Sequence, residues 1–150
     1  MDERVRKLKT PEDCVRFAAN ALRLNHPDLA DQARERAVEL RAAAYGASTD
    51  AERECLEAVY AYETVLTSRN GKTTKASRTW QMIKRHGIFE AVERAINRRE
   101  ETIGYTVLLE MGLQRFAFES VVMRHPTLFS PETVQRSSER TAEWARTAPV

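Results

Sequence analysis

Two helical signals follow one another in residues 10–46, which read TPEDCVRFAANALRLNHPDLADQARERAVELRAAAYG. Thr10 is a preferred N-cap residue, and Pro11 then takes the first helical position, where its missing N–H costs nothing. Apolar residues recur at helical spacing after it, at Cys14, Phe17, Ala18, Ala21 and Leu22. His26-Pro27 interrupts this pattern, and Gly46 ends the second helix. The stretch therefore predicts two helices packed as an antiparallel hairpin.

Similar start and stop signals divide the rest of the chain. Thr49 and Glu52 can form a capping box, and Ser130-Pro131 opens the last helix. Further helices are predicted over residues 49–70, 77–86, 88–97, around 105–109, over 113–124, and from 130 onward. No alternating strand pattern and no repeat of fixed period is visible. We therefore expect an all-α fold, a single compact domain of seven to eight helices over residues 1–150, with residues 1–9 and 147–150 frayed.

Composition narrows the class of protein. The chain has 150 residues, of which 42% are apolar and 31% charged, as expected for one soluble globular domain. The charged N-terminus lacks the apolar segment of a secretory signal, and no run approaches the length of a membrane span. Cys14 and Cys55 each lie on a helical pattern and are expected to be buried free thiols. These features predict a cytoplasmic protein with no membrane partner.

The charge of the chain is unevenly distributed. Residues 69–99 contain nine bases and two acids, a net charge of +7, whereas the rest contains fifteen bases and twenty acids. The total of +2 conceals this separation. A segment this basic in an otherwise acidic chain indicates a site for a polyanion, and nucleic acid is the first candidate.

The helix predicted over residues 77–86 divides this charge between two faces. At 100° per residue, Trp80 and Ile83 share one face with the preceding Ala76, whereas Arg78, Gln81 and Arg85 lie opposite and Lys84 lies to the side. Arginine can form two hydrogen bonds to guanine or phosphate, and glutamine can pair with adenine. At helical spacing with other apolar residues, Trp80 and Trp144 are expected in the core rather than stacked on bases.

Nucleic-acid binding, to DNA rather than RNA, is the leading hypothesis. The expected contact residues are Arg69, Lys72, Thr73, Thr74, Lys75, Ser77, Arg78, Gln81, Lys84 and Arg85. One alternative is a solvated helix with an incidental basic bias. Another is a helical interaction module whose basic side pairs with an acidic partner protein, or with its own helix over residues 50–63 in a homo-oligomer.

Two known motifs match only in part. With Gly87 as its turn glycine, residues 77–97 have some apolar positions of a helix-turn-helix, but Glu90 and Glu93 on the second helix would repel phosphate. Asn70-Gly71-Lys72-Thr73 resembles the end of a P-loop. It lacks the earlier glycine and follows a helix rather than a strand, which excludes nucleotide hydrolysis by this motif.

Catalytic and metal-binding signals are weak. His26, His86 and His125 have no metal-ligand spacing with either cysteine and lie at predicted helix boundaries, which indicates structural roles. The sequence therefore predicts no cofactor, no metal site and no catalytic residue. An enzyme would need a site assembled from residues distant in sequence.

One block of the sequence resembles other proteins. The segment Ser77–Gly87, SRTWQMIKRHG, together with Gly104-Tyr105 and the later Arg124-His125-Pro126, is similar to a block in bacterial proteins of unassigned function. The resemblance implies a bacterial, cytoplasmic protein. It implies no activity and no site residues.

Overall fold

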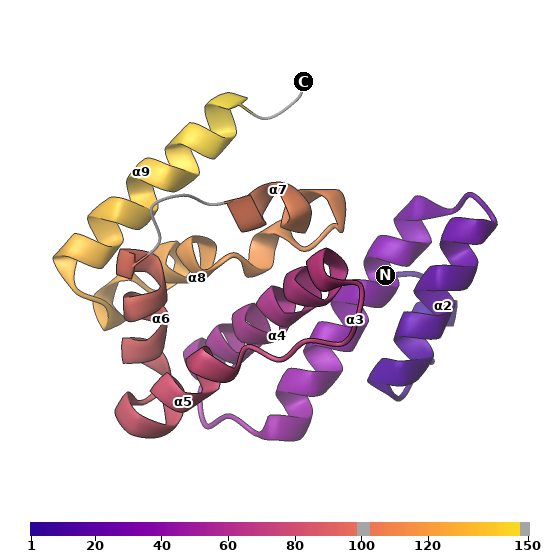
Figure 1. The fold of residues 1–150 in the computed structure, drawn as a ribbon, viewed down its shortest axis with the longest axis horizontal. Coiled ribbons are helices and arrows are strands. Elements are labelled where there is room, and N and C mark those ends of the chain that lie inside the picture. Colours follow the sequence, from indigo (N-terminus) through magenta and orange to yellow (C-terminus); the bar gives the residue numbers. More distant parts are fainter. Residues whose placement is uncertain (99–102, 148–150) are drawn as a thin grey trace.

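The structure, a computed structural model, describes residues 1–98 and 103–147 (Figure 1). Within these residues it contains α-helices, two short 3-10 helices and no strand, which confirms the predicted all-α fold in one compact chain. The α-helices are α1 (Glu3–Arg6), α2 (Pro11–Arg23), α3 (Pro27–Tyr45), α4 (Asp50–Asn70), α5 (Ser77–His86), α6 (Ile88–Arg98), α7 (Ile103–Glu110), α8 (Phe118–Arg124) and α9 (Pro131–Thr147). The 3-10 helices are η1 (Gln114–Phe116) and η2 (Pro126–Leu128).

Local capping signals set most of the helix ends. The Thr10 hydroxyl accepts the N–H of Asp13 at the start of α2, and Thr49 accepts that of Glu52 at the start of α4, both at 3.1 Å. The carboxylate of Glu52 closes the capping box one residue earlier than predicted, on the N–H of Ser48 at 2.9 Å. These bonds satisfy N–H groups that a helix start leaves without an intrahelical partner.

The N-terminal residues differ from the expectation of fraying. Residues 3–6 form α1, and Val5 is fully buried. The Arg36 guanidinium of α3 donates to the carbonyls of Arg6 and Leu8, at 3.4 and 3.3 Å. Arg36, which fixes this segment, lies about thirty residues away in the sequence, so no local pattern predicts that the segment is ordered.

The prediction of one continuous helix over residues 113–124 is wrong, because Ala117 interrupts the helix. Ala117 has an extended conformation, with φ −58° and ψ 142°, and separates η1 from α8. The break lets both neighbouring phenylalanines be buried. Phe116 packs with the cluster beside α7, and Phe118 packs with the cluster beside α6. In an unbroken helix these two side chains would point about 200° apart, on opposite sides of one cylinder.

Helix α4 is the centre of the fold (Figure 1). Cys55 and Val59 pack against α6 and α8, whereas Ala61 and Val65 pack against α3, α7 and η1. Both cysteines are free and buried, as predicted. Burial raises the pKa of the Cys55 thiol to about 12, so this thiol stays protonated and unreactive at neutral pH.

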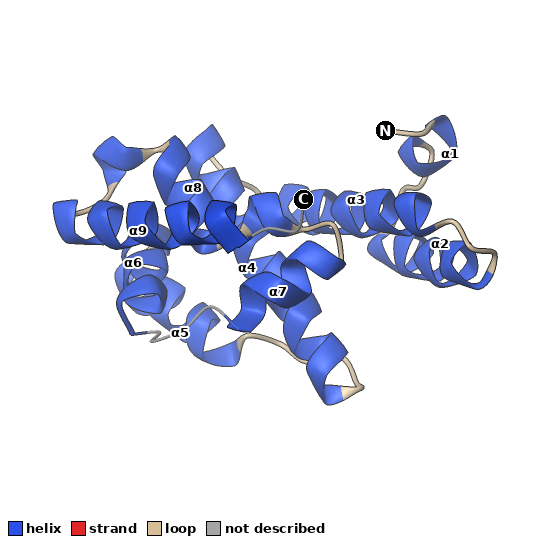
Figure 2. Ribbon diagram, turned by 90° about the horizontal axis from the view of Figure 1, so that it is seen from above, coloured by secondary structure: helices blue, strands red, loops and turns tan. Residues whose placement is uncertain are grey.

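Helix α2 stands at one end of the molecule and packs chiefly on α3 (Figure 2). Small residues at their interface let the two helices approach closely, among them Ala18, Ala21 and Ala33. Leu22 was expected on this buried stripe, but it is 46% exposed and lines a groove between α2 and α4. No helix in the described part of the chain is long and apolar enough to cross a bilayer.

Candidate nucleic-acid interface

The segment that follows α4 folds back along it. Figure 1 shows the connection running beside α4 before α5 begins. The backbone N–H of Thr74 donates to the Thr67 hydroxyl at 2.9 Å, and the N–H of Ala76 donates to the Glu63 carboxylate at 2.8 Å. Residues successively earlier in α4 thus bind residues successively later in the connection. This pairing fixes where α5 starts.

Glu63 and Trp80 complete the attachment of α5. The indole N–H of Trp80 donates to the same Glu63 oxygen at 2.7 Å. Its ring stacks on Tyr45, with centroids 5.5 Å apart, and packs against Tyr60 at 5.2 Å. Trp80 therefore joins α5 to α3 and α4, which confirms the prediction that it packs in the core. Trp144 is likewise stacked, on Tyr105, with ring centroids 3.9 Å apart.

The two faces of α5 are arranged as predicted. Ala76 and Thr79 are buried, and Trp80 and Ile83 are partly buried against the core. The side chains on the other side are exposed, namely Arg78, Gln81, Lys84 and Arg85. The row from Arg78 to Arg85 spans about 10 Å along the helix. These side chains are free to meet a partner from solvent.

Most of the remaining predicted contact residues lie between the last turn of α4 and the first residue of α5. The exposed ones are Arg69, Lys72, Thr73, Lys75 and Ser77. Thr74 differs from them, because its hydroxyl donates to the Lys72 carbonyl at 2.8 Å and accepts from the Asn70 amide at 3.1 Å. In the structure the Thr74 side chain is therefore partly buried and holds the loop in shape.

Ion pairing distinguishes the basic segment from the rest of the chain. Among the eight bases between Arg69 and Arg98, Arg94 alone pairs with an acidic side chain of the described chain. Among the fifteen bases elsewhere in residues 1–98 and 103–147, nine form such pairs. Arg99, the ninth base of the segment, lies outside the described residues. The positive charge of the segment is thus left largely uncompensated within the fold.

The two acids of α6 are occupied. Glu90 lies 3.2 Å from His86 and 3.7 Å from Arg94. Glu93 accepts the backbone N–H of Ser130 just before α9, which turns it toward the body of the protein. The repulsion of phosphate expected from Glu90 is therefore weakened by Arg94, whereas Glu93, whose partner is a neutral N–H group, keeps its charge.

An ordinary helix-turn-helix is not formed by α5 and α6. Gly87 alone separates them, with φ of +89°, whereas that motif uses a turn of about three to four residues. Helix α6 also buries Ala91, Val92 and Ile96 in the core. Any groove-binding helix here would be α5, whose polar face is open.

The histidines have structural surroundings. His125 ends α8 and hydrogen-bonds Glu54 of α4, which also accepts from Arg124. Burial opposes ionisation of Glu54, but the bonds from His125 and Arg124 outweigh it and lower the pKa of this carboxyl. His26 occupies the N-cap position of α3 without a side-chain capping bond.

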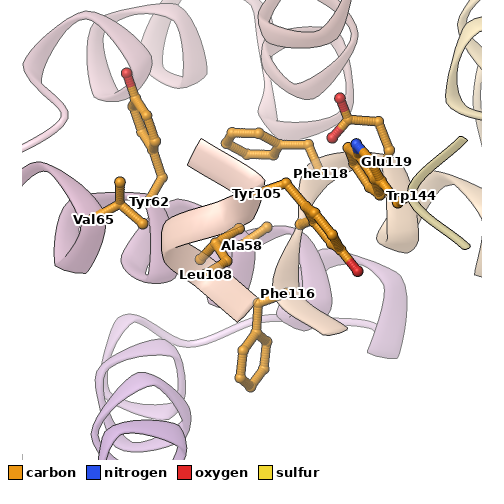
Figure 3. Close-up of a pocket in the computed structure, with 10 residues that line it drawn as sticks. Ala58, Tyr62, Val65, Tyr105, Leu108, Phe116, Phe118, Glu119 and Trp144 are labelled. Carbon is orange, nitrogen blue, oxygen red and sulfur yellow. The ribbon is translucent and has the colours of Figure 1, made fainter. Parts of the chain in front are cut away.

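One cavity lies in the core (Figure 3). It lies between α4, α7, η1, α8 and α9, and its volume is about 10 Å³, room for about one water molecule. Glu119 lines it beside Trp144 and accepts from Arg140 at 2.9 Å. The cavity is too small for a substrate. The described residues also contain no group of three or more His, Cys, Asp or Glu side chains that could hold a metal ion.

Sequence reasoning missed one residue of the interface, Glu63. It belongs to no motif, and its partners Ala76 and Trp80 lie thirteen and seventeen residues further along the chain. The nearest signal is a carboxylate on the same stripe of α4 as Tyr60 and Thr67. Its pairing with the start of α5 became visible only in the fold.

Comparison with known proteins gives no relative. No protein-family model matches the chain, and no curated protein or solved structure is significantly similar to it. The resemblance of the Ser77–Gly87 block to bacterial proteins therefore stays a prediction.

Proposed function

We propose that this protein binds nucleic acid, and duplex DNA in preference to RNA, through a basic surface. This surface consists of six exposed bases without an acidic partner in the described chain, namely Arg69, Lys72, Lys75, Arg78, Lys84 and Arg85. The exposed Thr73, Ser77 and Gln81 lie between them. Thr74 supports the loop.

The observation that carries the proposal is the lack of ion pairing. Elsewhere the fold compensates most of its bases with nearby acids, and on this surface it does not. Bases held close together without counter-charges repel one another, and this cost is recovered when a polyanion binds and releases its counterions. A DNA backbone supplies such a row of negative charges.

The geometry favours a duplex over a single strand. The exposed row of Arg78, Gln81 and Arg85 lies on one helix, and an α-helix fits the major groove of B-DNA. The major groove of an RNA duplex is too deep and narrow for side chains to read. Neither tryptophan is placed for stacking on unpaired bases, because Trp80 and Trp144 are both stacked on tyrosines.

The alternative of self-association through α4 has less support. Its acids already have partners inside the molecule. Glu54 bonds His125 and Arg124, Glu63 bonds Ala76 and Trp80, and Glu57 is buried beside Arg53. Glu54 and Glu57 are thus ion-paired inside the molecule, and Asp50, also paired with Arg53, is the most exposed acid that this helix offers to a second copy.

A pair of matched double variants tests the proposal. Arg78→Gln with Arg85→Gln removes two charges from the basic surface, and Arg23→Gln with Arg146→Gln removes two exposed charges that also lack an acidic partner in the described residues. Binding of a fluorescent DNA duplex at low salt is then measured by anisotropy. We expect the first variant to bind about tenfold more weakly or worse, and the second to bind within about twofold of the parent. Equal losses of affinity in both variants would show that DNA binding depends on the net charge of the protein and not on this surface, which would contradict the proposal.

A further inference from the structure

A second site lies beside α2, away from the exposed row of α5. It is a groove of about 590 Å³, with α2 as one wall, α4 and the connection after it as the other wall, and α3 as the floor. Figure 1 shows α2 standing apart from α4, with α3 behind both. The groove reaches the basic surface only at its edge, through Lys75 and the neighbouring Thr73.

The α2 wall of this groove is apolar. Val15 is 55% exposed and Leu22 is 46% exposed, and Ala18 and Ala19 lie between them on the groove side. Helix α2 thus has one apolar face on α3 and a second one open to the groove. From Val15 to Leu22 the second face extends about 10 Å along the helix. This strip is exposed apolar surface that the alkyl part of a bound ligand would cover.

A cation without a partner lies on the floor. Arg41 of α3 is partly buried, lines the groove, and has neither an ion pair nor a hydrogen bond among the described residues. Arg34, which lies on the same floor two turns earlier in α3, is by contrast bonded to Asp31 at 2.9 Å. A half-buried guanidinium loses part of its hydration, and an anion in the groove would restore that stabilisation.

Among the described residues, no acid of the groove is in ion-pair contact with Arg41. Glu63 lines the groove, but one of its oxygens already accepts the N–H groups of Ala76 and Trp80. Glu12 is exposed near the start of α2, and Lys75 adds a second free cation on the opposite wall. The groove therefore combines an apolar wall with two cations, Arg41 and Lys75, and two carboxylates, Glu12 and Glu63, none of which forms an ion pair within the described chain; Arg41 is the partly buried cation among them.

The volume of the groove, about 590 Å³, suits a small molecule. Clefts of about 300–1,000 Å³ are the usual size for small ligands. We propose that the groove binds a free monocarboxylate with a straight alkyl tail of about eight to ten carbons, its tail on Val15 and Leu22 and its carboxylate on Arg41.

Decanoate, below the concentration at which it forms micelles, is the probe that tests this assignment. Decanol and decyltrimethylammonium carry the same tail with a neutral and a positive head. We expect decanoate alone to bind saturably, and to shift the methyl NMR signals of Val15 and Leu22 while leaving those of the buried Val121 in place. Octanoate should bind about tenfold more weakly, because it buries two fewer methylene groups.

Matched variants locate the two ends of the ligand. Arg41→Gln should weaken decanoate binding about tenfold, whereas Arg23→Gln, an exposed base outside the groove, should leave it unchanged. Leu22→Ser should weaken binding of the tail, whereas Leu24→Ser, 63% exposed and outside the groove, should not. Circular dichroism of each variant confirms that it is folded.

Three outcomes would overturn the inference. Decanol binding as tightly as decanoate would remove the role of Arg41, and so would equal binding by the parent and folded Arg41→Gln. Absence of decanoate binding, with an acidic amphipathic peptide instead shifting the Val15 and Leu22 methyl signals, would assign the groove to a helical partner. None of these measurements involves DNA, so the result is independent of the proposed function.

Discussion

One oxygen of the Glu63 carboxylate accepts both the indole N–H of Trp80, at 2.7 Å, and the backbone N–H of Ala76, at 2.8 Å. A single side chain of α4 thereby holds the start of α5 and its largest apolar residue. The exposed row of Arg78, Gln81 and Arg85 owes its position to this attachment.

Glu63→Ala should therefore loosen α5. The change leaves two N–H groups without their acceptor, and we expect a loss of about 1–3 kcal/mol in the free energy of unfolding. Urea unfolding followed by circular dichroism measures it. Glu132→Ala, at an exposed position of α9, is the control and should cost less than about 0.5 kcal/mol. Similar small losses in both variants would show that Trp80 packing alone fixes α5.

Glu54→Gln should change the pH dependence of stability. The pKa of Glu54 is lowered in the fold, so its ionised form contributes stability above the unfolded pKa, and that contribution is lost as pH falls through the folded pKa. At neutral pH we expect Glu54→Gln to cost about 1–2 kcal/mol, since its bonds to His125 and Arg124 lose their charge.

The gap between Glu54→Gln and the parent should narrow as the pH drops below the ordinary glutamate value of 4.5. Urea unfolding at a series of pH values shows this directly. A gap that stays constant down to the acid transition would mean that the charge of Glu54 contributes nothing to stability.

Lys72 and Arg85 should affect DNA binding in different ways. Lys72 lies in the loop, where a flexible ammonium suits phosphate, and Lys72→Ala should weaken binding to every sequence about equally. Arg85 lies on the exposed row of α5. If this row enters the major groove, Arg85→Ala should cost about 1–3 kcal/mol at a preferred site and much less on scrambled DNA.

The preferred site in that comparison comes from a selected pool of random duplexes, and anisotropy gives the affinities. Equal losses on both DNAs for Arg85→Ala would describe a binder without sequence preference. Unchanged affinity of both variants for both DNAs would assign the basic surface to a protein partner.

Local chemistry explains why the sequence predicted most helices. Thr10 and Thr49 cap through bonds to residues three positions ahead, and Gly71 ends α4 in the left-handed conformation that glycine readily adopts. The break at Ala117 was not predictable in this way. It follows from the burial of Phe116 and Phe118 in two different clusters, which only the assembled core requires.

In the candidate interface, too, some features follow from local sequence and others only from contacts made in the fold. The exposed face of α5 follows from helical periodicity, so the spacing of Arg78, Gln81 and Arg85 was enough to predict that they are exposed on one face. The attachment of the connection to α4, through the Thr74 N–H on Thr67 and through Glu63, depends on contacts across seven to seventeen residues. Whether the bases of this surface form ion pairs likewise depends on where acids distant in the sequence lie in the fold.

The dependence of DNA binding on salt tests the central claim most directly. Each phosphate neutralised by a base of the surface contributes about −0.9 to the slope of log K against log salt concentration. About four to six contacts predict a slope of roughly −4 to −5 for a duplex, measured by fluorescence anisotropy with the unmodified protein. Steep weakening with this slope supports the account. No detectable binding at low salt would contradict it.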